Sequence, residues 1–159
     1  MRIEARLAEL GLALPRPTQA PPGVRLPFSP VRIRGNRAYV AGHGPVNPDG
    51  TLAGPFGKVP SQVSPESAYA SARLTGLSIL ASLARALGDL DRITAWLRVF
   101  GMVNCDPDFA MQPNVINGCS DLLLDVFGPE IGQHARSAVG QVALPFNMPV
   151  EIEAELEFE

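Results

Sequence analysis

Hydrophobic and polar residues alternate strictly over residues 150–159, which read VEIEAELEFE. Successive side chains of a β-strand point to opposite faces, so this segment predicts a strand with one apolar face and one acidic face. Charge at alternate strand positions is most often the solvated side of a sheet. The other interpretation is that one of these five glutamates acts as an acid or base.

Three segments carry helix signals. Apolar residues at helical spacing within residues 3–10 predict a short amphipathic helix. Ser64 followed by Pro65 is typical of a helix N-terminus, with serine as the cap and proline at the first helical position. The helix that begins there is predicted to be the longest and to end at Gly88. A second long helix is predicted over residues 112–128.

Four further segments predict strands and a loop. Residues 31–40 (VRIRGNRAYV) alternate on both sides of a Gly-Asn pair and predict a β-hairpin. Residues 92–104 are almost continuously apolar, which is typical of an interior strand. Another strand is predicted over residues 136–144. The glycine and proline content of residues 42–62 predicts a long loop, and long loops in compact domains are often functional.

The predicted order is helix, hairpin, helix, strand, helix, strand, strand. It favours one α+β domain over residues 1–159, with a single sheet and its two long helices on one face. Residues 1–27 are predicted to form a helix and a proline-rich extension before this core. The other sheet face then needs water or a second copy of the chain to cover it.

Composition narrows the classes of function. With 46% hydrophobic residues in a chain of 159, one domain with a real core is expected. The formal net charge of −3 and the lack of a basic run argue against nucleic acid as a partner. No uninterrupted apolar segment predicts a membrane span or secretory signal. Cys105 and Cys119 lack CxxC spacing, so a reduced, cytoplasmic setting is expected.

The sequence gives no support for a metal site, a nucleotide site, a Schiff-base lysine or a serine-hydrolase site. His43 and His134 have no metal-ligand partner at helical spacing, so no metal is expected. No phosphate-binding glycine motif is present, and no cofactor is expected. Lys58, the only lysine, lies in the long loop and is a poor candidate for Schiff-base chemistry. Ser137 lacks the nucleophile-elbow motif of a serine hydrolase.

Two polar residues remain as candidates for a site. Arg136 begins a predicted strand after a glycine-rich segment, where sites often form, although a solvent-exposed arginine in a minor ion pair is an equal alternative. Asn117 lies within a predicted helix that asparagine does not favour.

Two segments resemble the reactive-intermediate deaminase family, also called Rid or YjgF and historically labelled endoribonuclease L-PSP. They are ARSAVGQVALPFNMPVEIEAE near the C-terminus and GNRAYVAGHGPVNPDGTL after the first predicted strand. The resemblance covers roughly residues 28–159 and is strongest at Arg136-Ser137, Leu144-Pro145 and the EIEA run that starts at Glu151. The N-terminal extension indicates a longer subgroup.

The resemblance implies a chorismate-mutase-like α+β fold and a homotrimer with clefts between subunits. It implies hydrolysis of imines and enamines such as 2-aminoacrylate to 2-keto acids and ammonia. In that scheme Arg136 binds the substrate carboxylate, for which a planar guanidinium is well suited. Glu151 handles the attacking water and Asn117 shapes the cleft. The expected partners are small imino or keto acids, without nucleic acid or membrane.

The chain departs from the family pattern at three places. Phe28 stands where a tyrosine is usual, Ala41 and His43 flank Gly42 where the family has an SGQ segment, and Ala138 replaces a cysteine. These positions are still expected to line the substrate site, the last through its backbone carbonyl. Because polar contacts are lost, the alternative function is a non-catalytic trimer that binds small carboxylate metabolites in a regulatory role.

The resemblance also separates the five glutamates of the C-terminal strand. Glu151 becomes the candidate for chemistry, and the other four are expected to form a structural charge ladder. Arg32 and Arg34 alternate in the first predicted strand and are the expected cross-strand partners of that ladder.

Overall fold

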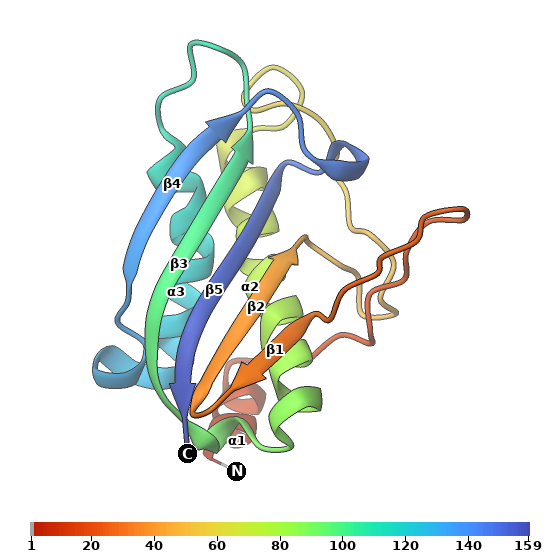
Figure 1. Cartoon of the computed structure of the whole chain (residues 1–159). Helices are drawn as coiled ribbons and strands as arrows, with labels where there is room; N and C mark the ends of the chain where they lie inside the picture. Colours follow the sequence, from red (N-terminus) through yellow and green to blue (C-terminus); the bar gives the residue numbers. More distant parts are fainter. Residues whose placement is uncertain (1) are drawn as a thin grey trace.

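A mixed five-stranded sheet with two long helices on one face forms the fold (Figure 1). The computed structural model describes residues 2–159. The elements follow the order predicted from the sequence. Their bounds are α1 Arg2–Glu9, β1 Val31–Arg34, β2 Arg37–His43, α2 Pro65–Leu87, β3 Ile93–Asn104, α3 Gln112–Ile131, β4 Ala135–Gln141 and β5 Val150–Phe158, with single 3₁₀ turns at Leu90–Arg92 and Pro145–Asn147.

The strands lie in the order β1-β2-β5-β3-β4. All neighbours are antiparallel except β3 and β4, which run parallel because α3 crosses over between them. The apolar strand β3 is therefore interior, as its sequence predicted, and β4 and β1 are the edges. The predicted α+β arrangement is confirmed.

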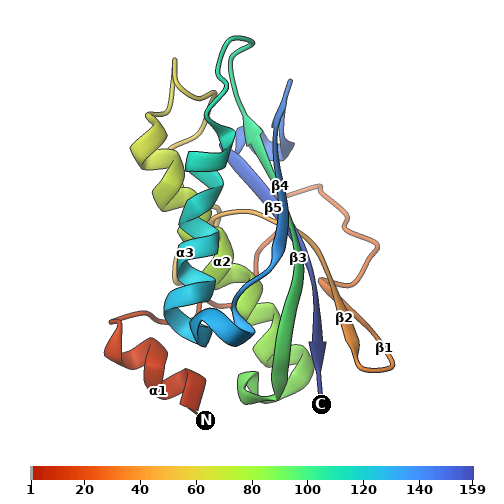
Figure 2. The ribbon, with the colours of Figure 1, turned by 90° about the vertical axis from the view of Figure 1, so that its left-hand side faces the viewer.

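Both long helices pack on the same face of the sheet, as Figure 2 shows. From β5 the apolar residues Val150, Ile152, Ala154 and Leu156 are buried on this face. The intervening glutamates lie on the opposite face, which no helix covers in Figure 2. Alternation along β5 thus separates core from open face as predicted. We refer to the two sides as the helix face and the open face.

The ends of α2 match their sequence signals. Ser64 Oγ accepts a hydrogen bond of 3.1 Å from the Ser67 N–H, and Gly88 ends the helix with a φ of +82°. Helix α3 continues three residues beyond the predicted end at 128, after a change of direction at Gly128, whose φ is +76°. Within residues 2–159, no helix is long and apolar enough to cross a membrane.

The charge ladder of β5 pairs with different arginines from those expected. Strand β2 lies between β1 and β5, so Arg32 and Arg34 are one strand too far away. The observed pairs are Arg37 Nε to Glu157 Oε1 at 3.4 Å and Arg98 Nη1 to Glu153 Oε1 at 4.0 Å. The expectation for Arg32 and Arg34 was wrong because strand order, which the alternation does not encode, decides which charges become neighbours.

Candidate functional site

Arg136 is fixed against helix α3 by hydrogen bonds to neutral oxygens. Its Nη1 donates to Asn117 Oδ1 at 2.8 Å and to Ser120 Oγ at 3.1 Å. Its Nη2 donates to the Pro113 carbonyl at 3.3 Å. The structure thus brings together Arg136 and Asn117, two residues that the sequence analysis singled out. A guanidinium has five N–H donors, so these contacts orient it and leave donors for a ligand.

Ser120 and His134 extend this hydrogen-bonded chain. His134 Nδ1 lies 2.7 Å from the Gly132 carbonyl and therefore carries the proton, because a carbonyl only accepts. The Nε2 atom, 2.9 Å from Ser120 Oγ, then accepts from the serine hydroxyl. The same oxygen accepts from Arg136. Sequence analysis missed Ser120 and considered His134 only as a metal ligand, although Ser120 follows Asn117 at i+3 and so shares its helix surface.

Glu151 lies at the start of β5 on the open face. Its side chain is half-buried, and burial together with the negative charge of Glu153 raises the pKa of its carboxyl group. Gly42 of β2 lies directly against it. A Cβ atom at position 42 would be 3.0 Å from Glu151 Cδ and Oε1, so glycine provides the space that the carboxyl group occupies.

A β-bulge places Ala41 and Gly42 beside this carboxyl group. The pairing of β2 with β5 shifts register between Val40 and His43. His43 Nδ1 donates to the Ala41 carbonyl at 2.6 Å, and its Nε2 accepts from Ser82 Oγ of α2 at 2.9 Å. His43 is 8% exposed as a residue, and burial lowers its pKa. A neutral histidine thus anchors the bulge to the helix layer.

The two groups of residues face opposite sides of the sheet. In the sheet register Arg136 of β4 pairs with the buried Val99 of β3. Glu151 of β5 pairs with Met102, which lies three residues farther along β3. Side chains alternate along a strand, so Arg136 projects on the helix face and Glu151 on the open face. One chain therefore forms an Arg136 half-site and a Glu151 half-site that do not meet.

Of the other predicted site residues, Ala138 lies near Arg136, whereas Phe28 lies in an exposed segment before β1. Ala138 lies two residues after Arg136 on β4 and shares its face. Phe28 belongs to the irregular segment before β1 and is 57% exposed. Both cysteines are free thiols, and burial raises the pKa of Cys119 to about 12. Within the described chain, no three His, Cys, Asp or Glu side chains gather as metal ligands.

Comparison with known protein families identifies the family to which this chain is similar. Residues 4–155 match the model of the family described as "YjgF/chorismate_mutase-like, putative endoribonuclease". The chain belongs to the YjgF/chorismate mutase-like family. This membership confirms the resemblance drawn from the Arg136-Ser137 and EIEA segments. It also agrees with the observed α+β architecture.

Relatives of this YjgF-family chain match over nearly its whole length. Protein TCP17 of Trypanosoma cruzi is 37% identical over 98% of this chain and 94% of its own. A protein of unknown function from Agrobacterium tumefaciens is 41% identical, with a TM-score of 0.86 over 98% of this chain and 91% of that one. A "putative endoribonuclease" of Shewanella oneidensis is 31% identical, with a TM-score of 0.88 over 98% and 99% of the two chains.

Proposed function

We propose that this YjgF-family protein hydrolyses reactive imines and enamines of the 2-aminoacrylate type to 2-keto acids and ammonia. The substrate carboxylate binds Arg136, and Glu151 handles the water and its protons. The observation that carries the proposal is a guanidinium held in place by neutral oxygens of Asn117, Ser120 and Pro113 rather than by a carboxylate. Such a group is oriented for an external anion, and its planar fork suits a bidentate carboxylate contact.

The surroundings of Glu151 support a role as general acid and base. Its raised pKa brings protonation closer to neutral pH, where a carboxyl group both accepts and returns protons. In the proposed reaction the Glu151 carboxylate takes a proton from water as the water oxygen attacks the carbon of the protonated imine, and a C–O bond forms. Glu151 returns this proton to the nitrogen of the resulting carbinolamine and the C–N bond breaks. The hydroxyl proton passes to the departing ammonia as the C=O bond forms, so the products are the 2-keto acid and ammonium, and the Glu151 carboxylate is regenerated.

A cleft between subunits completes the proposed site. Because the two half-sites project from opposite faces, a neighbouring chain must supply Glu151 to the Arg136 of the first. We expect a homotrimer in which each boundary joins one Arg136 half-site to one Glu151 half-site. The open face carries Tyr39, Phe100 and Met102 beside the glutamates, and this apolar surface favours contact with another copy.

A non-catalytic carboxylate binder is the second candidate. The apolar side chains of Phe28, Ala41 and Ala138 stand where the family resemblance leads us to expect polar ones. Such a protein keeps the Arg136 anion contact without turnover. Ribonuclease activity, suggested by the descriptions of relatives, is disfavoured by the formal net charge of −3 and the lack of a basic run along the sequence.

A direct assay tests the proposal. Purified protein is added to freshly generated 2-aminoacrylate, and pyruvate formation is followed. We expect acceleration that is lost in Arg136→Ala and Glu151→Gln and retained in Arg32→Ala, which removes an exposed arginine of the edge strand. Equal rates with and without protein would refute the enzyme. In that case calorimetry with 2-ketobutyrate, showing binding that depends on Arg136, supports the binder.

A further inference from the structure

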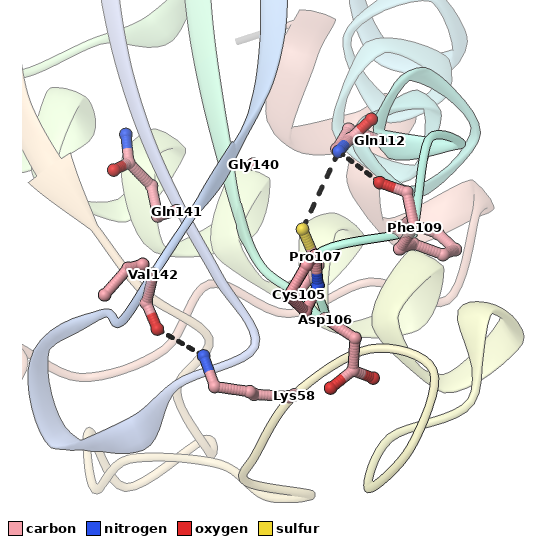
Figure 3. Close-up of a pocket in the computed structure, with 9 residues that line it drawn as sticks. All are labelled: Lys58, Cys105, Asp106, Pro107, Phe109, Gln112, Gly140, Gln141 and Val142. Carbon is pink, nitrogen blue, oxygen red and sulfur yellow. Dashed lines mark hydrogen bonds between the residues drawn. The ribbon is translucent and has the colours of Figure 1, made fainter.

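A cavity of about 470 Å³ opens at the end of β3 and β4 (Figure 3). Neither Arg136 nor Glu151 lines it. Its walls include the ammonium group of Lys58, the thiol of Cys105 and the amide of Gln112. The apolar side chains of Phe109 and Val142 and the backbone of Gly140 also line the cavity.

Lys58 is the positive charge of this cavity. The residue is half-buried, and its ammonium group donates to Asn104 Oδ1 at 2.9 Å and to the Val142 carbonyl. Asn104 is 1% exposed at the end of β3, so this contact fixes the lysine to the rigid sheet. An ammonium group has three donors and both oxygens are neutral. One N–H therefore remains for a ligand, and neither of these two contacts neutralises the ammonium charge, which also acts on the nearby Asp106 carboxylate.

Asp106, the acidic residue of the cavity lining, uses its carboxylate to bind the loop that carries Ser61. Its two carboxylate oxygens accept from Ser61, at 2.9 Å from the backbone N–H and 3.0 Å from Oγ. These hydrogen bonds, assisted by the charge of Lys58, lower the pKa of Asp106. In Figure 3 the carboxylate points away from the Cys105 thiol. Asp106 thus fixes the loop that carries Ser61 and leaves the thiol side of the cavity without a negative charge.

The thiol of Cys105 faces the cavity opposite Gln112. Gln112 Nε2 donates to the Phe109 carbonyl at 2.7 Å and points a second N–H at Cys105 Sγ, 3.6 Å away. A Cβ atom at position 140 would lie 2.7 Å from that sulfur and 2.9 Å from Nε2. Glycine at this position of the edge strand therefore leaves room for the oriented thiol.

We propose that this cavity is a second binding site, for small carboxylates. The carboxylate binds the Lys58 ammonium group, and the body of the ligand lies against Phe109 and Val142 with the Cys105 thiol beside it. Gly140 follows Arg136 by four residues on β4, so their Cα atoms lie about 13 Å apart along the strand, and Arg136 is not among the residues that line the cavity. The proposal does not rest on the proposed function, because it uses neither Arg136 nor Glu151.

Alkylation of Cys105 tests this site without any turnover assay. Iodoacetate and iodoacetamide have the same leaving group and similar size, but only iodoacetate carries a carboxylate. In both reactions an S–C bond forms, the C–I bond breaks, iodide leaves and the thiol proton passes to water. Cys119 is 1% exposed with a pKa of about 12, so it does not react at neutral pH. Mass spectrometry of the whole chain therefore reports Cys105, and Cys105→Ser abolishes the signal.

We expect the iodoacetate rate to saturate with concentration. The ratio of iodoacetate to iodoacetamide rates should be roughly fivefold higher in the wild type than in Lys58→Met. Lys58→Arg keeps the charge and should retain most of this preference, and Arg136→Met should leave it unchanged. Propionate should slow iodoacetate alkylation of the wild-type protein, whereas propionamide should not. This competition experiment uses only the wild-type protein, so it tests the proposal even if the Lys58→Met variant does not fold.

Two results would overturn the proposal. One is a rate ratio that Lys58→Met leaves unchanged in a protein with a wild-type circular dichroism spectrum. The other is an iodoacetate rate that rises linearly with concentration and that propionate does not slow. Loss of deaminase activity, or its absence from the outset, affects neither result, so the two proposals fail separately.

Discussion

Arg136 and Glu151 project from opposite faces of one sheet, on two strands that are separated by β3. The helix layer holds Arg136 through Asn117 and Ser120, while Glu151 lies on the open face against Gly42. A reaction that uses both residues therefore requires two chains. This relationship makes the proposed cleft testable by mixing variants.

Mixed oligomers should recover activity that neither parent has. Arg136→Ala and Glu151→Gln are each expected to be inactive as pure proteins. When they are unfolded together and refolded, about a quarter of the boundaries should join an intact Arg136 to an intact Glu151, since the two halves of each site come from different chains. The measurement is imine hydrolysis, with separately refolded proteins mixed afterwards as control. No recovery in co-refolded oligomers would contradict a shared site.

Asn117→Ala should weaken substrate binding more than it slows turnover. Asn117 accepts from Arg136 at 2.8 Å, and loss of one hydrogen bond to a charged group is expected to raise KM roughly tenfold. Steady-state kinetics with imino acids of increasing length measure this effect. Asn114→Ala, which changes an exposed residue of the same helix, is the matched control. An unchanged KM would show that Asn117 does not position the guanidinium for binding.

Glu153→Gln should shift the pH dependence of catalysis. Burial is the main cause of the raised pKa of Glu151, and the charge of Glu153 is the second. Removing that charge lowers the pKa of Glu151, so the acidic limb of the kcat/KM profile should move to lower pH. Glu157→Gln, farther along β5, should leave the limb in place. A limb that moves equally in both variants would argue against Glu151 as the titrating group.

Stability should fall as the pH drops below the ordinary histidine pKa of 6.5. Burial lowers the pKa of His43 in the folded protein, so between the two values the unfolded chain takes up a proton that the folded one excludes. The free energy of unfolding is unaffected above this window and decreases as pH falls through it. Urea denaturation at several pH values measures the slope.

A His43→Gln variant should lose most of this pH dependence, because the titrating group is gone while a hydrogen-bonding side chain remains. A His134→Gln variant retains His43 and should retain the slope. If both variants keep it, other groups are responsible for the loss of stability in acid.

Much of the fold follows from local chemistry that the sequence displays directly. The Ser64 cap, Pro65 and Gly88 set the ends of α2, because capping and left-handed backbone depend on the residue present. Alternation along β5 set its two faces, because side chains of a strand alternate whatever surrounds it. The likeness to the YjgF family was also visible, since it rests on short contiguous segments around Arg136 and Glu151.

Only the tertiary structure decided which residues became neighbours. Strand order put β2 between β1 and β5, and Arg37 rather than Arg32 or Arg34 pairs with the glutamate ladder. The packing of α3 against β4 linked Ser120 to Arg136, which lies 16 residues away in sequence. Arg136 lies on β4 and Glu151 on β5, and β3 pairs with both strands. The register of each strand against β3 decides whether the two side chains share a face. Alternation within one strand carries no information about that register, which is why the separation of Arg136 from Glu151 emerged only from the folded sheet.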